Sequence, residues 1–521
     1  MKSKLKGVKV LLILVAAHIT ANAQIFNVKD FGAVGDGKTV NTVAIQKAID
    51  KCSESGGQVL IPPGIFVSGT LYLKSKVNLH VEANGVLKGS PSFTDYPSNE
   101  VKYKNAFTHY ADGKSYDNKA FIFAERVSNI SFTGTGTIDG NGDSAEFQLG
   151  DDNNEKSRSR PCMLLIIDSK NISLSDLHLT NSAYWLQNYL GCENLKLQRL
   201  KIFNQSNYNQ DGIDIDAKNV LIEDCVIDVD DDGICFKSHD RNRMVGNAVV
   251  RNCTISSNCN AIKFGTTSIG GLKNVSIENC TIKKASADHI RNWQKNLKFI
   301  EQPITVISGI ALESVDGGII EDIRISNIRM TDVQTPIFIV LGNRDRKQVG
   351  DNASPIGKIE NISIRNIYAV SHSKMSSSIT AYPGQYIKNV KLENISISSM
   401  GKGTKAEANL NLPENSKDYP ENRMYGQVYP ASGFFIRHVN GLSFEGLELK
   451  TRSTDFRPAI IMDDVNNCRL NNLKVTPYPT VQPVIKIVGC KEISISKASP
   501  SLKSTDVIKL VNTSKGEVKV Y

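Results

Sequence analysis

A short pattern of polar and apolar positions returns along most of the chain. It begins with Asn and continues as apolar-x-apolar-x-x-apolar-x-apolar, with Val, Ile and Leu at most apolar positions. Alternation with a period of two residues is typical of a β-strand that buries one face. Clear copies begin at Asn129, Asn171, Asn194, Asn219, Asn247, Asn274, Asn361 and Asn389.

The spacing of these copies predicts a solenoid. Between Asn171 and Asn274, successive copies start 23, 25, 28 and 27 residues apart. Short strands that return every 20 to 30 residues or so predict coils that stack and bury one continuous core. Because β-branched residues dominate and no helical period separates the strands, we predict an all-β fold, a right-handed parallel β-helix.

The repeated asparagines are expected to be structural. An Asn side chain can satisfy the backbone groups of a turn, and amides on neighbouring coils can stack as a ladder. Substrate binding is the weaker alternative for these positions.

A short N-terminal capping helix is predicted from the segment NTVAIQKAIDKCSESGG, residues 41–57. Asn41 or Thr42 is the expected N-cap, and Gly56 and Gly57 end the helix. Its apolar side is expected to contain Val43, Ala44, Ala48 and Ile49. We expect the helix to cover the open first coil, whose strand edges would otherwise favour aggregation.

Residues 1–23 predict a signal peptide. Four lysines precede an apolar stretch, residues 10–17, and Ala21-Asn22-Ala23 provides a cleavage site. The apolar stretch is too short to cross a bilayer, and we predict no membrane span elsewhere. We therefore expect an exported protein, periplasmic or secreted. Because no segment rich in Pro, Gly or Ser divides residues 24–521, these residues are predicted to form a single domain, and we expect a monomer.

Net charge and cysteine content indicate which partners and which covalent links to expect. Removal of the four lysines lowers the net charge from +9 to +5, spread along the chain without the basic face of a nucleic-acid-binding protein. This excess would suit an acidic substrate, but ordinary surface charge is the favoured explanation. Cys225, Cys253 and Cys280 recur with the repeat, so we expect the ten cysteines to be mostly buried free thiols.

Three segments align as successive coils: QDGIDID from Gln210, DDGICFK from Asp231 and CNAIKFG from Cys259. Their apolar residues, with Ile213, Ile234 and Ile262 in one row, must point into the core. The alternate positions therefore face outward. These outward residues are Asp214, Asp216, Cys235, Lys237, Lys263 and Gly265.

The same alignment concentrates carboxylates at the strand starts. Asp211 and Asp232 share one level, Asp231 lies one residue earlier, and neighbouring coils are about 4.8 Å apart. Close carboxylates do not all ionise easily, so one can keep its proton while another acts as a base. Glycoside hydrolysis needs such a pair. A calcium site or a hydrated turn is the alternative, and Asp230 is interpreted as a turn residue.

The chain resembles glycoside hydrolase family 28, the polygalacturonases and rhamnogalacturonan hydrolases. The resemblance covers DFGAVGDGKTVNTVAIQKAID near the start, GTGTIDGNG from Gly134 and RPCMLLIIDSKNISLSDLHLTNSAYW from Arg160. Asn209-Gln210-Asp211 matches the N-T-D motif of the family with Gln at its centre, and Asp231-Asp232 matches the D-D motif.

The resemblance implies an inverting hydrolase in which Asp231 is the general acid and Asp211 and Asp232 activate water. It implies no metal and no cofactor. Asn209 and Asp214 are assigned to substrate binding together with Lys237, Lys263 and Trp185. For each lysine, neutralising the surplus aspartates is the alternative, and for Trp185 the alternative is a place in the core.

Two motifs of the family are missing. Asn258-Cys259-Asn260 replaces G-H-G, and SGIALES places Ala311 and Glu313 where the family has the Arg and Lys of R-I-K. In the family, these cations hold the galacturonate next to the leaving oxygen, a group that Glu313 would repel. A neutral rhamnose at this position removes the conflict, so the resemblance favours cleavage of galacturonate–rhamnose linkages in rhamnogalacturonan.

Three further features have open interpretations. Cys259 is interpreted as a packing residue, with a nucleophile as the weaker alternative. His239 and His289 lie near the cleft in sequence but have no predicted partner. The segment KDYPENRMYGQVYPASGFF, from Lys417, interrupts the repeat and could close one end of a cleft, which would favour exo action, or serve as a structural plug.

The expected partner is therefore a pectic polysaccharide or oligosaccharide. Polygalacturonase activity is the first alternative function. A pectic lyase, which would need a calcium-binding acid cluster, and a non-catalytic glycan-binding β-helix are the others.

Overall fold

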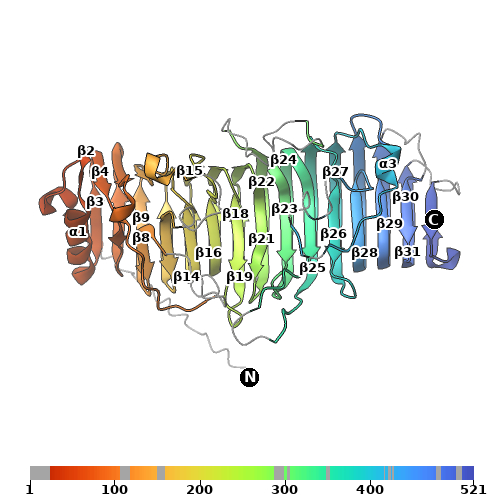
Figure 1. Cartoon of the computed structure of the whole chain (residues 1–521), viewed down its shortest axis with the longest axis horizontal. Coiled ribbons are helices and arrows are strands. Elements are labelled where there is room, and N and C mark those ends of the chain that lie inside the picture. The colour runs from red at the N-terminus through yellow and green to blue at the C-terminus, as the bar shows by residue number, and fades with distance from the viewer. Residues whose placement is uncertain are drawn as a thin grey trace, which may run out of the picture.

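The computed structural model describes residues 24–105, 118–149, 159–286, 299–301, 306–347, 352–415, 417–419, 424, 428–476, 483–499 and 507–521. The coils succeed one another along an elongated solenoid, with the N-terminal helix at one end and the C-terminus at the other (Figure 1). Strands of successive coils pair in parallel throughout the ladders of the described residues. The predicted right-handed parallel β-helix is confirmed.

Each coil contributes strands to three faces. The first face contains β5 (Leu71–Tyr72), β8 (Ala120–Glu125), β11 (Cys162–Ile167), β18 (Ile234–Ser238), β21 (Asn260–Ser268), β23 (Val306–Ser314), β26 (Ser377–Ala381), β30 (Ile485–Val488) and β32 (Ile508–Val511). The second contains β1 (Ile25–Asn27), β3 (Gly57–Ile61), β6 (Val77–Val81), β9 (Ser128–Gly134), β12 (Lys170–Ser175), β19 (Val245–Arg251) and β33 (Val518–Val520). The third contains β2 (Asp36–Val40), β4 (Gly64–Ser68), β7 (Gly85–Gly89), β10 (Thr137–Asp139), β13 (His178–Thr180), β15 (Lys201–Asn204), β17 (Val226–Val229) and β20 (Thr254–Ser257).

Longer strands bend from one face to the next. They are β14 (Gln187–Gln198), β16 (Ile213–Glu223), β22 (Leu272–Lys284), β24 (Ile319–Leu341), β25 (Lys358–Ser371), β27 (Ile387–Ser399), β28 (Phe434–Thr451), β29 (Ile460–Thr476) and β31 (Lys491–Ser499). The helices are α1 (Thr42–Ser55) and α3 (Lys405–Ala408), with short 3₁₀ turns at Val28–Phe31, Phe93–Asp95, Ala145–Phe147 and Lys515–Glu517.

The predicted register of the three acid-bearing coils is confirmed. Ile213 pairs with Ile234, which pairs with Ile262, and all three side chains are fully buried. Phe236 and Phe264 stack in the next core row, with ring centroids 5.0 Å apart. Because side chains alternate along each strand, the residues between these apolar positions lie on the outer side of the first face.

The asparagines form the expected ladder. The side-chain amide of Asn171 donates to the side-chain oxygen of Asn129 at 2.8 Å, and Asn194 donates to Asn171 at 2.8 Å. The ladder continues through Asn219, Asn247 and Asn274 at 3.0, 3.3 and 3.0 Å. The φ angles of these residues lie between 50° and 58°. Asn tolerates this left-handed conformation better than other non-glycine residues, which explains the repeated residue type.

The cysteine prediction is confirmed. All ten cysteines are free thiols, and all except the half-buried Cys259 are buried. Cys225, Cys253 and Cys280 belong to the continuous apolar core. They therefore act as small apolar residues inside the stack.

Helix α1 lies beside β1 and β3 at the N-terminal end of the solenoid (Figure 1). It buries Ile45, Ala48, Ile49 and Cys52. Asn41 is the N-cap, as predicted, although its side chain makes no capping bond and instead accepts from the Val34 N–H at 2.7 Å. One detail of the prediction was wrong. Val43 is 69% exposed, because the helical period gives its place in the core to Ile45.

The predicted signal peptide, residues 1–23, lies outside the described residues. Among the described residues, no helix is both long and apolar enough to cross a membrane.

Candidate active site

Turns that precede β16 and β18 bring the predicted acids together. The Gly212 N–H donates to the Asp232 carbonyl oxygen at 2.8 Å, so Asp211 and Asp232 lie at the same level of adjacent coils. Asp231 is anchored to its neighbour, because its Oδ1 accepts from the Asp232 N–H at 2.9 Å. The three side chains form one cluster on the outer side of the first face, as the alignment predicts.

The cluster is deep. Asp211 and Asp232 are each 4% exposed and Asp231 is 9% exposed. Asp214, on the outer side of β16, is 1% exposed. Asp230 lies in the bend directly after β17, as its interpretation as a turn residue predicts, and it is completely buried. Buried carboxylates are costly unless counter-charges or hydrogen bonds compensate them.

Two lysines supply those counter-charges. Lys237 Nζ lies 2.7 Å from Asp214 Oδ1 and 3.3 Å from Asp211 Oδ2. Lys263 Nζ lies 3.0 Å from Asp232 Oδ2, whose Oδ1 also accepts from the Asn260 side-chain amide at 2.8 Å. Both lysines thus contact the acids, as the neutralising alternative requires.

Burial and crowding change the acidity of these groups. Burial, followed by the charge on Asp214, raises the pKa of Asp211 well above its usual range, and the Lys237 ammonium opposes this shift. Burial also raises the pKa of Asp214, again against the effect of Lys237. For Lys237, burial favours a lower pKa, but the carboxylates of Asp214 and Asp211 outweigh it and raise the pKa well above the usual range. Lys237 therefore stays charged.

Aromatic and amide groups complete one side of the cluster. The ring of Trp185, which is half-buried, lies 4.7 Å from Lys237 Nζ and 4.6 Å from the ring of Tyr184. Asn209, at φ 56°, accepts at its side-chain oxygen from Arg160 Nη2 at 3.3 Å. Asn209 thus fixes the turn that carries Asp211, a role separate from its predicted role in substrate binding.

Arg160 was missed as a site residue. It is 2% exposed, and its Nη1 donates to the carbonyl oxygens of Ala183 and Tyr208 at 3.0 and 2.8 Å. It therefore ties together the two turns that carry Trp185 and Asn209. The available sequence signal was an arginine directly before a continuous apolar strand, where a charged residue needs a buried partner.

The opposite side of the cluster contains Glu313, on β23. Glu313 is completely buried, and neither side-chain oxygen has a hydrogen-bond partner in the described structure. Burial raises the pKa of Glu313 to about 7, against the effect of the nearby Lys263 ammonium. Ala311 is also buried and lies beside Lys263 in the strand register. Ala311 and Glu313 thus place a methyl group and a carboxyl group on this side of the cluster.

The segment from Lys417 reaches this side of the site. The Tyr419 ring lies 5.9 Å from Lys263 Nζ and 5.0 Å from the guanidinium of Arg344. Arg344 also donates to the Tyr419 hydroxyl at 2.7 Å and forms a two-point ion pair with Asp316. Tyr419 is therefore fixed at the edge of the acid cluster.

Apolar clusters cover the outer side of the first face on both sides of the acids. Toward the N-terminus, outer residues of β8, β11 and β14 are buried beneath Val101 and Tyr103; they are Phe123, Leu165, Ile167 and Leu190. Toward the C-terminus, Ala311, Phe338, Val340, Phe435 and Ile461 are buried with Phe299, Met375, Leu412, Met424 and Tyr429. Between the two clusters, the outer side of β16, β18 and β21 carries Asp214, Lys237 and Lys263.

The remaining predicted residues have different outcomes. His239 has a partner after all, because its Nδ1 lies 3.0 Å from Asp216 Oδ2. His289 lies outside the described residues. Cys259 has its sulfur within 4.8 Å of carboxylate oxygens of Asp231 and Asp232. Two carboxylates and a thiol are far from the six to eight or so oxygen ligands that Ca²⁺ takes, and Lys263 already pairs with Asp232.

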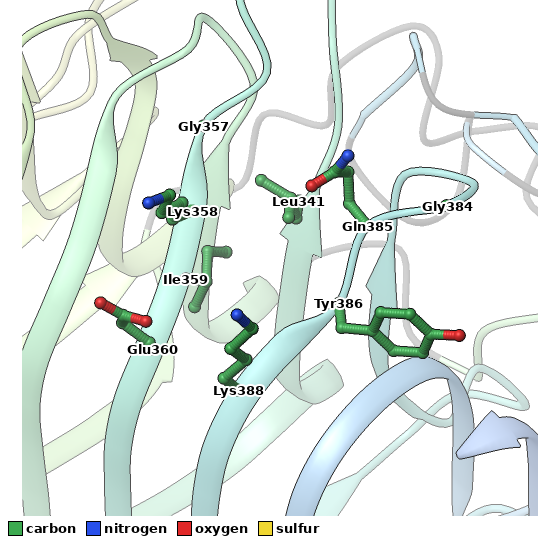
Figure 2. Close-up of a pocket in the computed structure, with 9 residues that line it drawn as sticks. All are labelled: Leu341, Gly357, Lys358, Ile359, Glu360, Gly384, Gln385, Tyr386 and Lys388. Atoms are coloured by element: carbon green, nitrogen blue, oxygen red, sulfur yellow. The ribbon is translucent and has the colours of Figure 1, made fainter. Parts of the chain in front are cut away.

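A separate pocket lies at another corner of the solenoid, between the end of β24 and the starts of β25 and β27 (Figure 2). Leu341 and Ile359 form its apolar part, and Lys358, Gln385 and Lys388 are exposed at its rim. Its volume, about 240 Å³, is below the roughly 300–1,000 Å³ of ordinary ligand sites. The acid cluster remains the better candidate for chemistry.

Residues 57–417 match the sequence model described as "Glycosyl hydrolases family 28". The chain belongs to glycosyl hydrolase family 28. The predicted glycoside hydrolase, an enzyme acting on O-glycosyl bonds, is confirmed.

Several family relatives resemble this chain. A probable polygalacturonase of Vitis vinifera is 26% identical over 415 residues, which cover 76% of this chain and 79% of the relative. An exopolygalacturonase of Platanus acerifolia is 23% identical over 399 residues, which cover 74% and 93%. A solved exopolygalacturonase of Thermotoga maritima superimposes with a TM-score of 0.59 at 19% identity, covering 82% of this chain and 92% of that chain.

The fold extends beyond the family. A tailspike protein of the E. coli bacteriophage HK620 superimposes with a TM-score of 0.60 at 13% identity, covering 95% of this chain and 80% of that chain. Similarity of fold alone therefore does not decide the substrate, which has to be argued from the family 28 site.

Proposed function

We propose that this family 28 hydrolase cleaves galacturonate–rhamnose linkages of acidic pectic polysaccharide from a chain end, with inversion of configuration. The observation that carries the proposal is the buried Glu313 beside Ala311, on the side of the cluster that the family resemblance assigns to the leaving sugar. The proposal concerns the substrate and the residue roles within the hydrolase family.

The division of roles follows the lysine contacts. Asp211 contacts Lys237 and Asp232 contacts Lys263, and an ammonium group favours the ionised form of a carboxyl group. We assign the activation of water to Asp211 and Asp232; Lys237 opposes the raised pKa of Asp211, so this carboxyl group ionises at a lower pH than burial alone would allow. Asp231 protonates the leaving oxygen, and water attacks from the opposite side of the sugar, which inverts its configuration. No metal or cofactor takes part in this scheme.

The leaving sugar is proposed to be neutral. A galacturonate at this position would bring its carboxylate toward Glu313, with neither the Arg nor the Lys of the family motif to hold it. An unpaired anion facing a carboxyl group in a buried site is strongly disfavoured. A rhamnose has no charge, so the position of Glu313 does not oppose it.

The galacturonate on the other side of the bond still needs a cation. Lys263 contacts one described carboxylate, whereas Lys237 contacts two. The charge of Lys263 is therefore less fully compensated by the protein, and Lys263 is better able to pair with a substrate carboxylate. Trp185 can present its ring to a sugar, because an aromatic face packs against the C–H groups of a pyranose. Asn209 and Asp214 remain candidates for hydrogen bonds to the hydroxyl groups.

Action at a chain end is supported by the segments that cover the first face. Apolar clusters cover this face on both sides of the acids, whereas an enzyme that cuts within a polymer needs a groove open at both ends. Tyr419, from the predicted interrupting segment, contributes to the closure.

Product analysis tests the proposal. The mature protein is incubated separately with rhamnogalacturonan oligosaccharides that end in galacturonate and with polygalacturonate. We expect free galacturonate from the first substrate and at least tenfold slower release from the second. Asp231→Asn, a nearly isosteric change, should abolish both reactions, and an unchanged melting temperature would show that the variant is folded.

Faster cleavage of polygalacturonate would contradict the neutral leaving sugar and support polygalacturonase activity, which the names of the relatives favour. Unsaturated products that absorb in the ultraviolet would instead indicate a lyase. Binding without cleavage by the wild-type protein would indicate a non-catalytic glycan-binding role.

A further inference from the structure

Lys237 has an environment that differs from that of a substrate-binding lysine. Its Nζ lies 2.7 Å from Asp214 Oδ1, 3.3 Å from Asp211 Oδ2 and 4.7 Å from the centre of the Trp185 ring. The side chain is 14% exposed. Two carboxylates and an aromatic face thus surround the ammonium group, and each of these groups stabilises a cation.

These contacts would be expensive to break. If the Lys237 ammonium moved to a substrate carboxylate, Asp211 and Asp214, at 4% and 1% exposed, would lose their closest cation inside the protein. Removing one partner from a buried ion pair leaves an uncompensated charge, which is strongly unfavourable. Lys237 is therefore better suited to hold the acids than to bind a sugar.

We propose that Lys237 is a positioning residue that favours the ionised form of Asp211 and holds this carboxyl group in place, while Asp214 and Trp185 hold its ammonium group. The inference rests on the proposed function, in which Asp211 helps to activate water. It goes further, because it assigns to Asp214 and Lys237 opposite effects on the same catalytic carboxylate.

The opposite signs follow from elementary electrostatics. The positive charge of Lys237 favours the ionised form of Asp211, so its removal makes Asp211 harder to ionise. The negative charge of Asp214 disfavours that form, so its removal makes Asp211 easier to ionise. Removal of Lys237 and removal of Asp214 should thus shift the titration of Asp211 in opposite directions.

Other titratable groups also face this cluster, and they are the same in the Lys237 and Asp214 variants. From the β17–β18 turn and β18 come Asp231, Asp232 and Cys235, and from β21 comes Lys263. Cys162, at the start of β11, with Arg160 nearby, and His239, directly after β18, also act on these charges. Lys237 is the cation among the described residues that contacts Asp211 directly.

The test is the pH dependence of kcat/KM on the best oligosaccharide substrate. Activity should rise with pH as Asp211 ionises. In Lys237→Met this acidic limb should move to higher pH by about one unit or more, and in Asp214→Asn it should move to lower pH. Lys237→Arg keeps the positive charge and should bring the limb back toward that of the wild type.

A direct titration separates this inference from the substrate proposal. Carboxyl ¹³C NMR of protein labelled at aspartate follows Asp211, assigned through its loss in Asp211→Asn, without any substrate. The same opposite shifts are expected even if the tested oligosaccharides are not cleaved. If Lys237→Met does not fold, Asp214→Asn still decides the sign.

Two results would overturn the inference. The first is a raised KM in Lys237→Met with an unchanged pH profile, which would make Lys237 a substrate-binding residue. The second is a lower melting temperature with no movement of either titration, which would reduce Lys237 to a structural role.

Discussion

At the scale of single residues, charge pairing explains why so many aspartates are tolerated in one place. Asp211, Asp214 and Asp232 each have a lysine ammonium within 3.3 Å, although all are at most 4% exposed. Buried carboxylates that are compensated in this way remain available for proton transfer. A hydrated turn would need neither the burial nor the lysines.

Asp211, Asp231 and Asp232 could be predicted from the sequence because strand alternation fixes which side chains share a face. The exact contacts of Lys237 could not be predicted from the sequence, because the position of the adjacent coil decides which carboxylates a flexible lysine side chain can reach. Arg160 was missed for the same reason, because its contacts are carbonyl oxygens of turns distant in sequence.

Glu313 leads to a prediction about stability. Its pKa of about 7 lies above the ordinary value of 4.5, so the folded protein binds more protons than the unfolded chain between these values. Stability should therefore fall as the pH rises from about 4.5 to about 7. Glu313→Gln should remove this loss of stability, which amounts to up to about 3 kcal/mol. The free energy of unfolding of the variant should therefore increase relative to that of the wild type as the pH rises. Urea unfolding at several pH values measures the difference; a constant difference would contradict the buried carboxyl.

Glu313 also leads to a prediction about specificity. Glu313→Lys introduces a cation where the family has one, so cleavage of polygalacturonate relative to rhamnogalacturonan should rise about tenfold, the equivalent of one charge-assisted hydrogen bond. Glu313→Gln serves as the uncharged control and should give a smaller rise. Unchanged selectivity in both folded variants, measured as the ratio of kcat/KM values, would separate Glu313 from substrate choice.

At the scale of elements, turn chemistry and strand alternation support each other. The ladder asparagines combine a left-handed turn conformation with amide bonds between coils, so one residue type satisfies two requirements. The sequence therefore predicted the second face well. The covering segments were less predictable, because they lack a repeat and their positions depend on the apolar residues that the first face happens to expose.

The ladder can be tested at Asn219. Asn219→Ala removes its bonds to Asn194 and Asn247 and places a β-carbon at φ 58°, so we expect the free energy of unfolding to fall by about 1–3 kcal/mol. Asn219→Gly accepts the turn conformation but lacks the amide, which separates the two contributions. Denaturant unfolding provides the measurement, and no loss in either variant would show that the ladder adds nothing to stability.

At the scale of the whole molecule, a solenoid provides a long flat face, and the covering segments decide how much of it a polymer can reach. Here Val101 and Tyr103 cover one side of the acids, and Tyr419 with the neighbouring apolar cluster covers the other. Cleavage should therefore lower the viscosity of a rhamnogalacturonan solution slowly compared with the release of reducing ends. A rapid fall in viscosity at low conversion would contradict action at chain ends.

The measurement that tests the central claim most directly is a ¹H NMR time course of the wild-type protein acting on a rhamnogalacturonan oligosaccharide that ends in galacturonate. The account predicts that free galacturonate appears first as the anomer opposite to the original linkage, together with an oligosaccharide that now begins with rhamnose. Galacturonate of the original configuration, an unsaturated sugar, or fragments from the middle of the chain would contradict it.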